Sequence, residues 1–386
     1  MSQRLTIAFD GKRAANNRTG LGNYSRHIIG LLAKDFPDNR YFVFLPNANK
    51  NPQFDEILKQ NPQIEVILPQ KWFWKKLSSL WRITGIKKDI AKIENVIYHG
   101  LSNELPLTIK KTNAKSIVTI HDLIFLKFPK YYNYFDRKIY THKFRKACEN
   151  ADRIIAVSEC TKRDIVEHFK INPEKISVIY QGCDKVFKNE IPQDKLLSVK
   201  QKYNLPDRFL LNVGSIEERK NALLLVKALP LLKEKLPIVI IGKRTKYTTE
   251  VENMAEKLGV GNLLHIYDNV PFDDLAPIYH LSEVFIYPSR YEGFGIPIIE
   301  AISCKVPVIA ATGSCLEEAG GPDCQYVNPD DENELAKAIE KITDIPKNQY
   351  FRSTTITNSL EYVKRFSEEN QAEELIKCYK EISYEG

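Results

Sequence analysis

The sequence contains no long hydrophobic run, no paired cysteines, no internal repeat and no low-complexity tail. No stretch of its 386 residues approaches the ~20 apolar residues that cross a bilayer. Its first residues form a strand-like pattern rather than a signal peptide. The seven cysteines are scattered and odd in number, which is typical of buried thiols in a reducing compartment. We therefore expect a soluble, cytoplasmic protein.

Motifs for metal ions and nucleic acid are missing as well. No cluster of His, Cys or carboxylates has the spacing of a metal site, so we expect no tightly bound metal and no other cofactor. There is no zinc finger, aromatic RNA-binding signature or arginine-rich tail, which argues against a nucleic-acid partner. Charge is nevertheless uneven, with 33 Lys and Arg against 19 Asp and Glu in residues 1–190, and 23 against 30 in residues 191–386. The basic half is expected to face something anionic, such as a membrane surface.

Short apolar runs alternate with helical patterns, which is typical of parallel sheets with helices on both faces. The polar stretch 182–203 interrupts this alternation and predicts a domain boundary near residue 190. We expect an α/β protein with two doubly wound, Rossmann-like domains, 1–190 and 191–365, that face each other across a cleft. A terminal helix, 366–386, would pack back on the first domain. The expected strands are 5–9, 41–45, 64–68, 95–98, 116–120 and 153–157, then 209–213, 238–241, 264–266, 284–287 and 306–310.

Two glutamates lie in the run Tyr-Glu-Gly-Phe-Gly-Ile-Pro-Ile-Ile-Glu (291–300), directly after an expected strand. The glycines let backbone amides face a ligand, and Pro297 suits the first turn of a helix. Glu292 would lie in the turn and Glu300 in the first helical turn, where the dipole favours a carboxylate. The pair could hold the hydroxyls of a sugar and a ribose. The alternative is an ordinary structural turn followed by a dipole partner.

Arg219 and Lys220 follow the expected strand 209–213 and precede a helix. Two adjacent cations beside a helix N-terminus suit a diphosphate, and a solvated loop is the alternative. Without a metal motif, these cations and nearby amides would have to neutralise a diphosphate leaving group.

Two motifs of the first half complete the set. The loop Thr19-Gly-Leu-Gly-Asn-Tyr24 leads into a helix that could offer amides to an anion. It is neither a Walker loop nor a complete dinucleotide motif, and a structural turn is the competing interpretation. His121 ends the expected strand 116–120 and would point into the cleft, unless it is a core histidine satisfied by hydrogen bonds.

Taken in order, these motifs resemble a retaining glycosyltransferase of family four with the GT-B fold. The resemblance covers nearly the whole chain, and the two-glutamate run is its specific element. The other matching runs are 19–24, 121–125, 156–159, 179–184 and 214–221. Some members carry an additional arginine where this chain has Ser215. Either Arg219 and Lys220 suffice here, or the phosphate geometry differs.

The resemblance implies a role for each motif. Glu292, His121, Arg219 and Lys220 would be catalytic, with Glu292 on the donor sugar's hydroxyls and His121 beside the transferred sugar. Glu300 would bind the ribose of the donor, and Arg219 and Lys220 would bind its diphosphate. The backbone amides around the donor sugar would be those of Gly293, Phe294, Gly295 and Ile296. The backbone amides opposite the two cations would be those of Gly20, Leu21 and Gly22.

The implied reaction is transfer of a hexose from a nucleotide-sugar donor with retention of configuration. Same-face attack is the expected route, and a double displacement through Glu292 is the alternative. Resemblance to mannosyltransferases of cell-surface polysaccharide synthesis favours GDP-mannose, while a UDP-hexose or UDP-N-acetylhexosamine stays open. A non-catalytic sugar-nucleotide-binding protein is the alternative from another class. A dinucleotide oxidoreductase would need a complete Gly-x-Gly-x-x-Gly motif, which is missing.

All three tryptophans lie in the basic segment 71–88. Aromatic and basic residues on one short helix suit a membrane surface with anionic lipid, here the inner face of the cell membrane. The acceptor implied by the family, a growing glycan often carried on polyprenyl diphosphate, agrees with this. The alternative is a helix packed on the first sheet, with Trp81 in the core.

Overall fold

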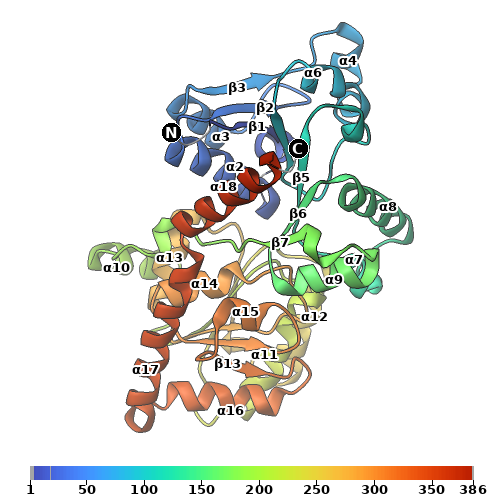
Figure 1. Cartoon of the computed structure of the whole chain (residues 1–386). Helices are drawn as coiled ribbons and strands as arrows, with labels where there is room; N and C mark the ends of the chain where they lie inside the picture. The colour runs from blue at the N-terminus through green and yellow to red at the C-terminus, as the bar shows by residue number, and fades with distance from the viewer. Residues whose placement is uncertain (1–3, 18, 385–386) are drawn as a thin grey trace. The chain divides into compact units, whose positions relative to one another are not determined.

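The computed structural model describes residues 4–17 and 19–384 and divides the chain into two compact units. The first unit spans residues 1–180 and 368–386, and the second spans 181–367 (Figure 1). The boundary therefore lies at 180 rather than 190. The reason is Phe187, whose ring lies 5.7 Å, centroid to centroid, from the rings of both Phe272 and Tyr279 of the second unit.

The first unit is built on a parallel sheet with strand order β3-β2-β1-β4-β5-β6-β7. In register, Ile7 of β1 lies opposite Tyr41 of β2 and Ile97 of β4. The central strands are almost wholly buried because helices cover both faces of the sheet. The strands are β1 (Thr6–Asp10), β2 (Arg40–Phe44), β3 (Ile64–Ile67), β4 (Val96–Gly100), β5 (Lys115–Ile120), β6 (Arg153–Ala156) and β7 (Ile176–Val178).

Side-chain caps fix the starts of several helices in this unit. Asn51, Asn133 and Ser158 each accept a hydrogen bond from a backbone amide of the first turn that follows. The helical elements are α1 (Lys12–Asn16), α2 (Gly20–Asp35), α3 (Pro52–Gln60), α4 (Trp72–Lys76), α5 (Ser78–Leu80), η1 (Trp81–Gly85), α6 (Lys87–Ile90), η2 (Ile109–Lys111), α7 (Ile124–Lys127), η3 (Pro129–Tyr131), α8 (Tyr134–Asn150), α9 (Glu159–Phe169) and η4 (Pro173–Lys175).

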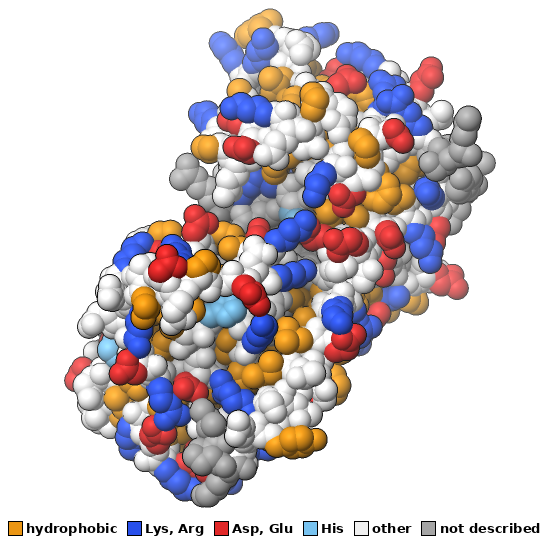
Figure 2. All heavy atoms as spheres, turned by 90° about the vertical axis from the view of Figure 1, so that its left-hand side faces the viewer, with side chains coloured by type: hydrophobic (Ala, Val, Ile, Leu, Met, Phe, Trp, Pro, Cys, Tyr) orange, Lys and Arg blue, Asp and Glu red, His pale blue; other side chains and the backbone are white. Residues whose placement is uncertain are grey.

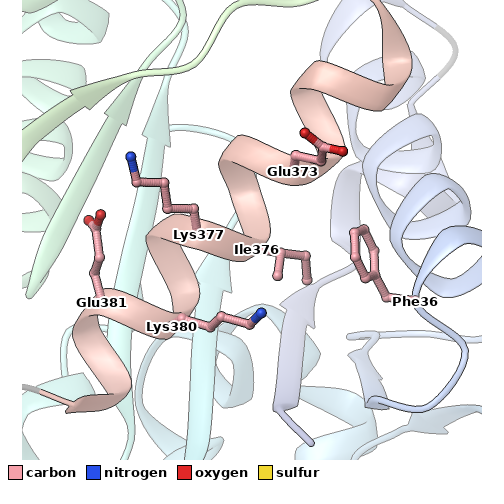
Figure 3. A pocket seen from close by; sticks show the side chains of 6 residues that line it. All are labelled: Phe36, Glu373, Ile376, Lys377, Lys380 and Glu381. Atoms are coloured by element: carbon pink, nitrogen blue, oxygen red, sulfur yellow. The ribbon is translucent and has the colours of Figure 1, made fainter. Parts of the chain in front are cut away.

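The last helix, α18 (Glu368–Tyr384), belongs to the first unit and packs along α2 (Figure 1). Its apolar face joins the core of that unit through Leu375, Tyr379 and Ile382. At its edge, Ile376 faces Phe36 across an open cavity of about 460 Å³, while Lys377 and Glu381 point away from Phe36 (Figure 3). The packing of the terminal helix on the first domain is thus as the sequence predicts.

The second unit has its own parallel sheet, with strand order β10-β9-β8-β11-β12-β13. Its strands are β8 (Leu210–Val213), β9 (Ile238–Ile241), β10 (Leu264–Tyr267), β11 (Val284–Tyr287), β12 (Val308–Ala311) and β13 (Gln325–Val327). Its helical elements are η5 (Lys185–Phe187), α10 (Gln193–Lys202), η6 (Glu218–Lys220), α11 (Ala222–Ala228), η7 (Leu229–Leu231), α12 (Lys246–Lys257), η8 (Gly261–Leu263), α13 (Phe272–Leu281), α14 (Ile296–Ser303), α15 (Leu316–Gly320), α16 (Glu332–Thr343), α17 (Ile345–Val363) and η9 (Lys364–Phe366). The prediction of two Rossmann-like parallel sheets is confirmed.

The tryptophan segment differs from the single short helix that the sequence predicts. It is divided into α4, α5, the π-helical turn η1 and α6. Trp81 lies in the core, 1% exposed, and donates to Asp89 Oδ2 at 3.0 Å. Trp72 is 72% exposed, and Phe73, Leu77 and Leu80 are exposed as well. One tryptophan thus serves the core, and another is presented to solvent.

Candidate active site

A buried carboxylate with two cations is the centre of the candidate site in the second unit. Glu292 Oε1 lies 2.7 Å from Arg219 Nη1 and 2.6 Å from Lys220 Nζ. The hydroxyls of Ser289 and Tyr287 donate to the same oxygen at 2.6 and 3.2 Å. The side chains of Glu292, Arg219 and Lys220 are only 11%, 15% and 14% exposed, so the interpretation of 214–221 as a solvated loop is wrong.

The local backbone explains why these side chains converge. Arg219 and Lys220 lie on η6 after β8, and Glu292 follows the neighbouring strand β11. The amide of Arg290 donates to the carbonyl of Arg219 at 2.9 Å, which ties the two loops together. Asn221, at φ 61°, reverses the chain after η6, and its side-chain amide donates to the carbonyls of Pro288 and Pro329.

Electrostatics keep this cluster ionised. Burial alone would raise the pKa of Glu292, but the charges of Lys220 and Arg219 and the hydrogen bond from Ser289 lower it to about 2. Burial alone would lower the pKa of Arg219, yet Glu292 and then Glu217, 2.6 Å away, raise it above its ordinary value. Glu292 is therefore a fixed anion at neutral pH and is not equipped to act as a general acid.

Glu300 lies in a different environment. It is the fifth residue of α14, so it stands in the second helical turn and not in the first as the sequence predicts. The reason is that the helix begins at Ile296, just after Gly295. Burial raises the pKa of Glu300 to about 7, against a hydrogen bond from the Tyr279 hydroxyl at 2.9 Å that lowers it. Its charge thus changes near neutral pH.

The turn between β11 and α14 contains the four backbone amides that are predicted to contact the donor sugar. Gly293 and Phe294 form the turn, Gly295 is the N-cap of α14, and Ile296 is its first residue. A Cβ on Gly295 would lie 2.7 Å from the Cβ of Ala319, so this position requires glycine for close packing. The contact of these four amides with a donor sugar stays a prediction.

In the first unit, His121 lies just after β5 and is held in one orientation. Its backbone amide donates to Asn103 Oδ1 at 2.7 Å, and its Nε2 lies 2.9 Å from the carbonyl oxygen of Leu101. Its ring meets the Tyr24 ring edge-on, with 4.6 Å between the centroids. A carbonyl only accepts, so Nε2 carries the proton. Burial lowers the pKa of His121 to about 4, so the ring is neutral and Nδ1 is left as an acceptor.

A chain of buried hydrogen bonds connects this histidine environment to the terminal helix. The Tyr24 hydroxyl lies 3.3 Å from Thr119 Oγ1, which lies 2.8 Å from His99 Nε2. His99 Nδ1 in turn lies 2.7 Å from the hydroxyl of Tyr379 on α18. We call Tyr24, Thr119, His99 and Tyr379 the buried relay. Sequence reasoning missed it, since His99 and Tyr379 are 280 residues apart.

In the loop 19–24, Gly22 does not have the anion-binding role that the sequence predicts for its amide. α2 begins at Gly20, and the amide of Gly22 donates to the carbonyl of Thr19 at 2.9 Å. A Cβ on Gly22 would lie 2.0 Å from the carbonyl oxygen of Asn17, so this glycine permits close approach of two backbone segments. Gly22 therefore has a packing role, and its amide is not free for an anion. A contact of the Gly20 and Leu21 amides with phosphate stays a prediction.

Two further polar clusters were not predicted. The buried Arg82 pairs with Asp10 at 2.6 Å and with Glu104 at 2.7 Å. On α9, Asp164, Glu167 and His168 bring possible ligand atoms within 4.8 Å of one another, at an i, i+3, i+4 spacing that could have been seen in the sequence. Asp164 is buried and Glu167 is exposed, and proximity of such groups does not by itself show an ion, so transfer without a metal remains a prediction.

Comparison with known proteins agrees with the fold and the motifs. Residues 19–186 match the model of Glycosyltransferase Family 4, and residues 194–358 match Glycosyl transferases group 1. The chain is 29% identical over 378 residues to O-antigen chain mannosyltransferase B of Escherichia coli, covering 94% of this chain and 96% of that protein.

Solved structures give the same fold. A glycosyltransferase from Rickettsia africae ESF-5 matches 98% of this chain and 99% of its own, with a TM-score of 0.77 and 23% identity. Anabaena Alr3699/HepE in complex with UDP matches 98% of this chain and 100% of its own, with a TM-score of 0.74 and 16% identity. Within the described residues, no helix is both long and apolar enough to span a membrane.

Proposed function

We propose that this chain moves a mannosyl group from GDP-mannose onto a growing cell-surface glycan, with retention of configuration. It belongs to the glycosyltransferases, through Glycosyltransferase Family 4 in its first half and Glycosyl transferases group 1 in its second. The observation that carries this proposal is the cluster of Glu292, Arg219 and Lys220. It combines a fixed carboxylate for sugar hydroxyls with two cations for a diphosphate.

The donor contacts follow from the charges. Arg219 and Lys220 stabilise the negative charge that grows on the departing nucleoside diphosphate, which is the main electrostatic task of this reaction. Glu292 accepts hydrogen bonds from the donor sugar and holds both cations in place before the donor arrives. Glu300 accepts from the hydroxyls of the ribose when it is ionised. No metal is needed in this scheme.

Same-face attack is the route that the geometry favours. The acceptor oxygen forms its bond to the anomeric carbon as the bond to the diphosphate breaks, and the leaving phosphate takes the acceptor's proton. A double displacement would need Glu292 as the nucleophile. Its Oε1 already receives four donors, and its pKa of about 2 makes it a weak nucleophile.

His121 recognises a hydroxyl and does not carry charge. Because Nε2 donates to the carbonyl of Leu101, the neutral ring offers Nδ1 as an acceptor for a hydroxyl of the transferred sugar. At pH 7 its lowered pKa keeps it from acting as an imidazolium acid. Its expected contribution is therefore orientation of the sugar.

The acceptor is proposed to be a glycan carried on a polyprenyl diphosphate, used at the inner, cytoplasmic face of the membrane. The segment 71–88 exposes Trp72, Phe73, Leu77 and Leu80 beside several lysines. The α4 region lies at the top of Figure 1, and at the top of Figure 2 Lys and Arg side chains lie beside hydrophobic ones. Sedimentation with anionic liposomes should fall with rising salt and in Trp72→Ala. No binding even at low salt would contradict this contact.

Donor identity is the direct test of the proposed reaction. Purified protein is incubated with GDP-mannose, UDP-glucose or UDP-N-acetylglucosamine and a lipid-extract acceptor, and released nucleotide and product are followed by chromatography. We expect GDP release with mannosylated product. Turnover with a UDP sugar alone would support the alternative donor, for which Anabaena Alr3699/HepE in complex with UDP is a structural parallel. Nucleotide binding without transfer from any donor would favour a non-catalytic binding protein.

A further inference from the structure

The first unit contains a cavity of about 370 Å³ that the donor chemistry does not use. One wall is formed by η1 and the segment that follows β4, and the other by α8. The amide of Leu107 donates to the carbonyl of Ile83 at 3.0 Å, and the Thr108 hydroxyl donates to the carbonyl of Thr84 at 3.1 Å. These bonds fix the first wall as a single surface. The lining is mixed, with Ile83, Leu105, Leu107 and Ile139 as apolar members and Lys138 and Lys143 as cations.

The base of the cavity is charged and held by ion pairs. Arg82 is buried and bonded to both Asp10 and Glu104, and Lys143 Nζ lies 3.5 Å from the other oxygen of Glu104. Asp10 ends β1, and Glu104 follows β4, so the cavity lies at the carboxyl edge of the parallel sheet. Ligands of open α/β sheets bind at this edge.

The apolar lining continues onto an exposed surface. Ile139 and Leu107 are each 49% exposed, and Tyr134 and Phe135, one turn before Lys138 and Ile139 on α8, are exposed as well. The surrounding residues 127–150 include seven Lys and Arg against two Asp and Glu. An apolar surface with a strongly basic surround complements a ligand that is apolar at one end and anionic at the other.

We propose that this cavity binds the lipid-diphosphate end of the acceptor, with the first prenyl units against Ile83, Leu107 and Ile139 and the diphosphate beside Lys138 and Lys143. The assignment rests on the proposed function for the identity of the acceptor. The mixed lining selects this occupant, because a free glycan would leave four apolar side chains uncovered. A purely apolar ligand would leave Lys138, which forms no ion pair within the described residues, without a counter-charge, whereas Lys143 is already paired with Glu104.

The test measures binding of farnesyl diphosphate to the full-length protein by isothermal titration calorimetry, with saturating GDP present to occupy the nucleotide site. Inorganic diphosphate and farnesol are titrated separately. We expect farnesyl diphosphate to bind more tightly than either. Ile139→Asp should weaken its binding about tenfold or more, because a charge replaces an apolar contact, and Lys138→Ala combined with Lys143→Ala should weaken it by a similar factor. Leu231→Asp, at a leucine of the second unit that is 44% exposed, is the matched control.

Three results would overturn the assignment. Equal affinity of the wild type and Ile139→Asp for farnesyl diphosphate would show that the apolar wall does not contact the prenyl chain. Equal affinity of the wild type for farnesol and farnesyl diphosphate would show that the lysines do not bind the diphosphate. Inorganic diphosphate binding as tightly as farnesyl diphosphate would indicate a site for phosphate alone. If GDP itself does not bind, the proposed function fails, and the cavity is then tested in the variant Arg219→Ala/Lys220→Ala, which lacks the other diphosphate contacts.

Discussion

The two units hold their candidate site residues by opposite means. In the second unit, the carboxylate of Glu292 is fixed by ion pairs with Arg219 and Lys220. In the first, His121 is fixed by a backbone carbonyl and an aromatic edge, and the burial that lowers its pKa keeps it neutral. The difference teaches that charge is concentrated where a diphosphate would leave. Neutral hydrogen bonding is kept where hydroxyls would be recognised.

The largest expected effect comes from removing a cation of the second unit. Arg219→Ala and Lys220→Ala, made separately, should each lower kcat by at least tenfold, and about a hundredfold if the cation acts mainly in the transition state. Each also leaves the buried Glu292 with one ion pair fewer, so the free energy of unfolding should fall by about 2 kcal/mol. Steady-state kinetics and thermal unfolding measure the two effects, with Lys227→Ala, an exposed lysine of α11, as the control. Wild-type turnover in both variants would show that neither Arg219 nor Lys220 stabilises the leaving diphosphate.

A smaller effect is expected from the buried relay of the first unit. Tyr379→Phe removes the hydroxyl that lies 2.7 Å from His99 Nδ1 and leaves a buried ring nitrogen without a partner. The free energy of unfolding should fall by about 1–2 kcal/mol, measured by urea unfolding. Tyr350→Phe, at a tyrosine 84% exposed in the second unit, should change nothing. Equal stability of the two variants would show that the relay does not hold α18 on its unit.

The smallest effect concerns the pH dependence of Glu300. Its pKa is raised from 4.5 to about 7, so the folded protein holds this proton longer than the unfolded chain does. The associated stability is therefore complete below pH 4.5 and is lost as the pH rises to 7. Conversely, GDP affinity should rise a few-fold above pH 7, where the carboxylate is ionised and can accept from the ribose. Titration calorimetry between pH 6 and 8 checks this, and a flat profile in Glu300→Gln would assign the change to this residue. The same rise in Glu300→Gln would contradict it.

The sequence is sufficient to predict which loops converge in the second unit. Arg219, Lys220 and Glu292 follow neighbouring parallel strands, whose carboxyl ends share one edge of a sheet. It does not reveal that Tyr287 and Ser289 complete the shell around Glu292, because hydrogen bonds to one oxygen depend on side-chain directions. The strands β7 and β13 were missed because three residues are too few to show a period.

The long-range contacts of the first unit were beyond sequence reasoning. The sequence predicts a terminal helix over 366–386 that packs back on the first domain, and α18 returns to that unit after the chain turns at Ser367, but the pattern does not show which side chains the helix meets there. His99 finds Tyr379 only through that return of the chain. Trp81 and Trp72 belong to the same aromatic run, yet a turn of π-helix sends one into the core and leaves the other outside.

The most direct test is Glu292→Gln assayed for GDP affinity and for mannosyl transfer side by side. The substitution keeps the size of the side chain and removes the charge that holds Arg219 and Lys220. We predict GDP affinity equal to or tighter than that of the wild type, since both cations are released toward the diphosphate, while kcat falls by about a hundredfold as the sugar loses its anionic partner. Unchanged kcat would contradict the account, because it would mean that the carboxylate at the centre of the cluster serves the fold alone.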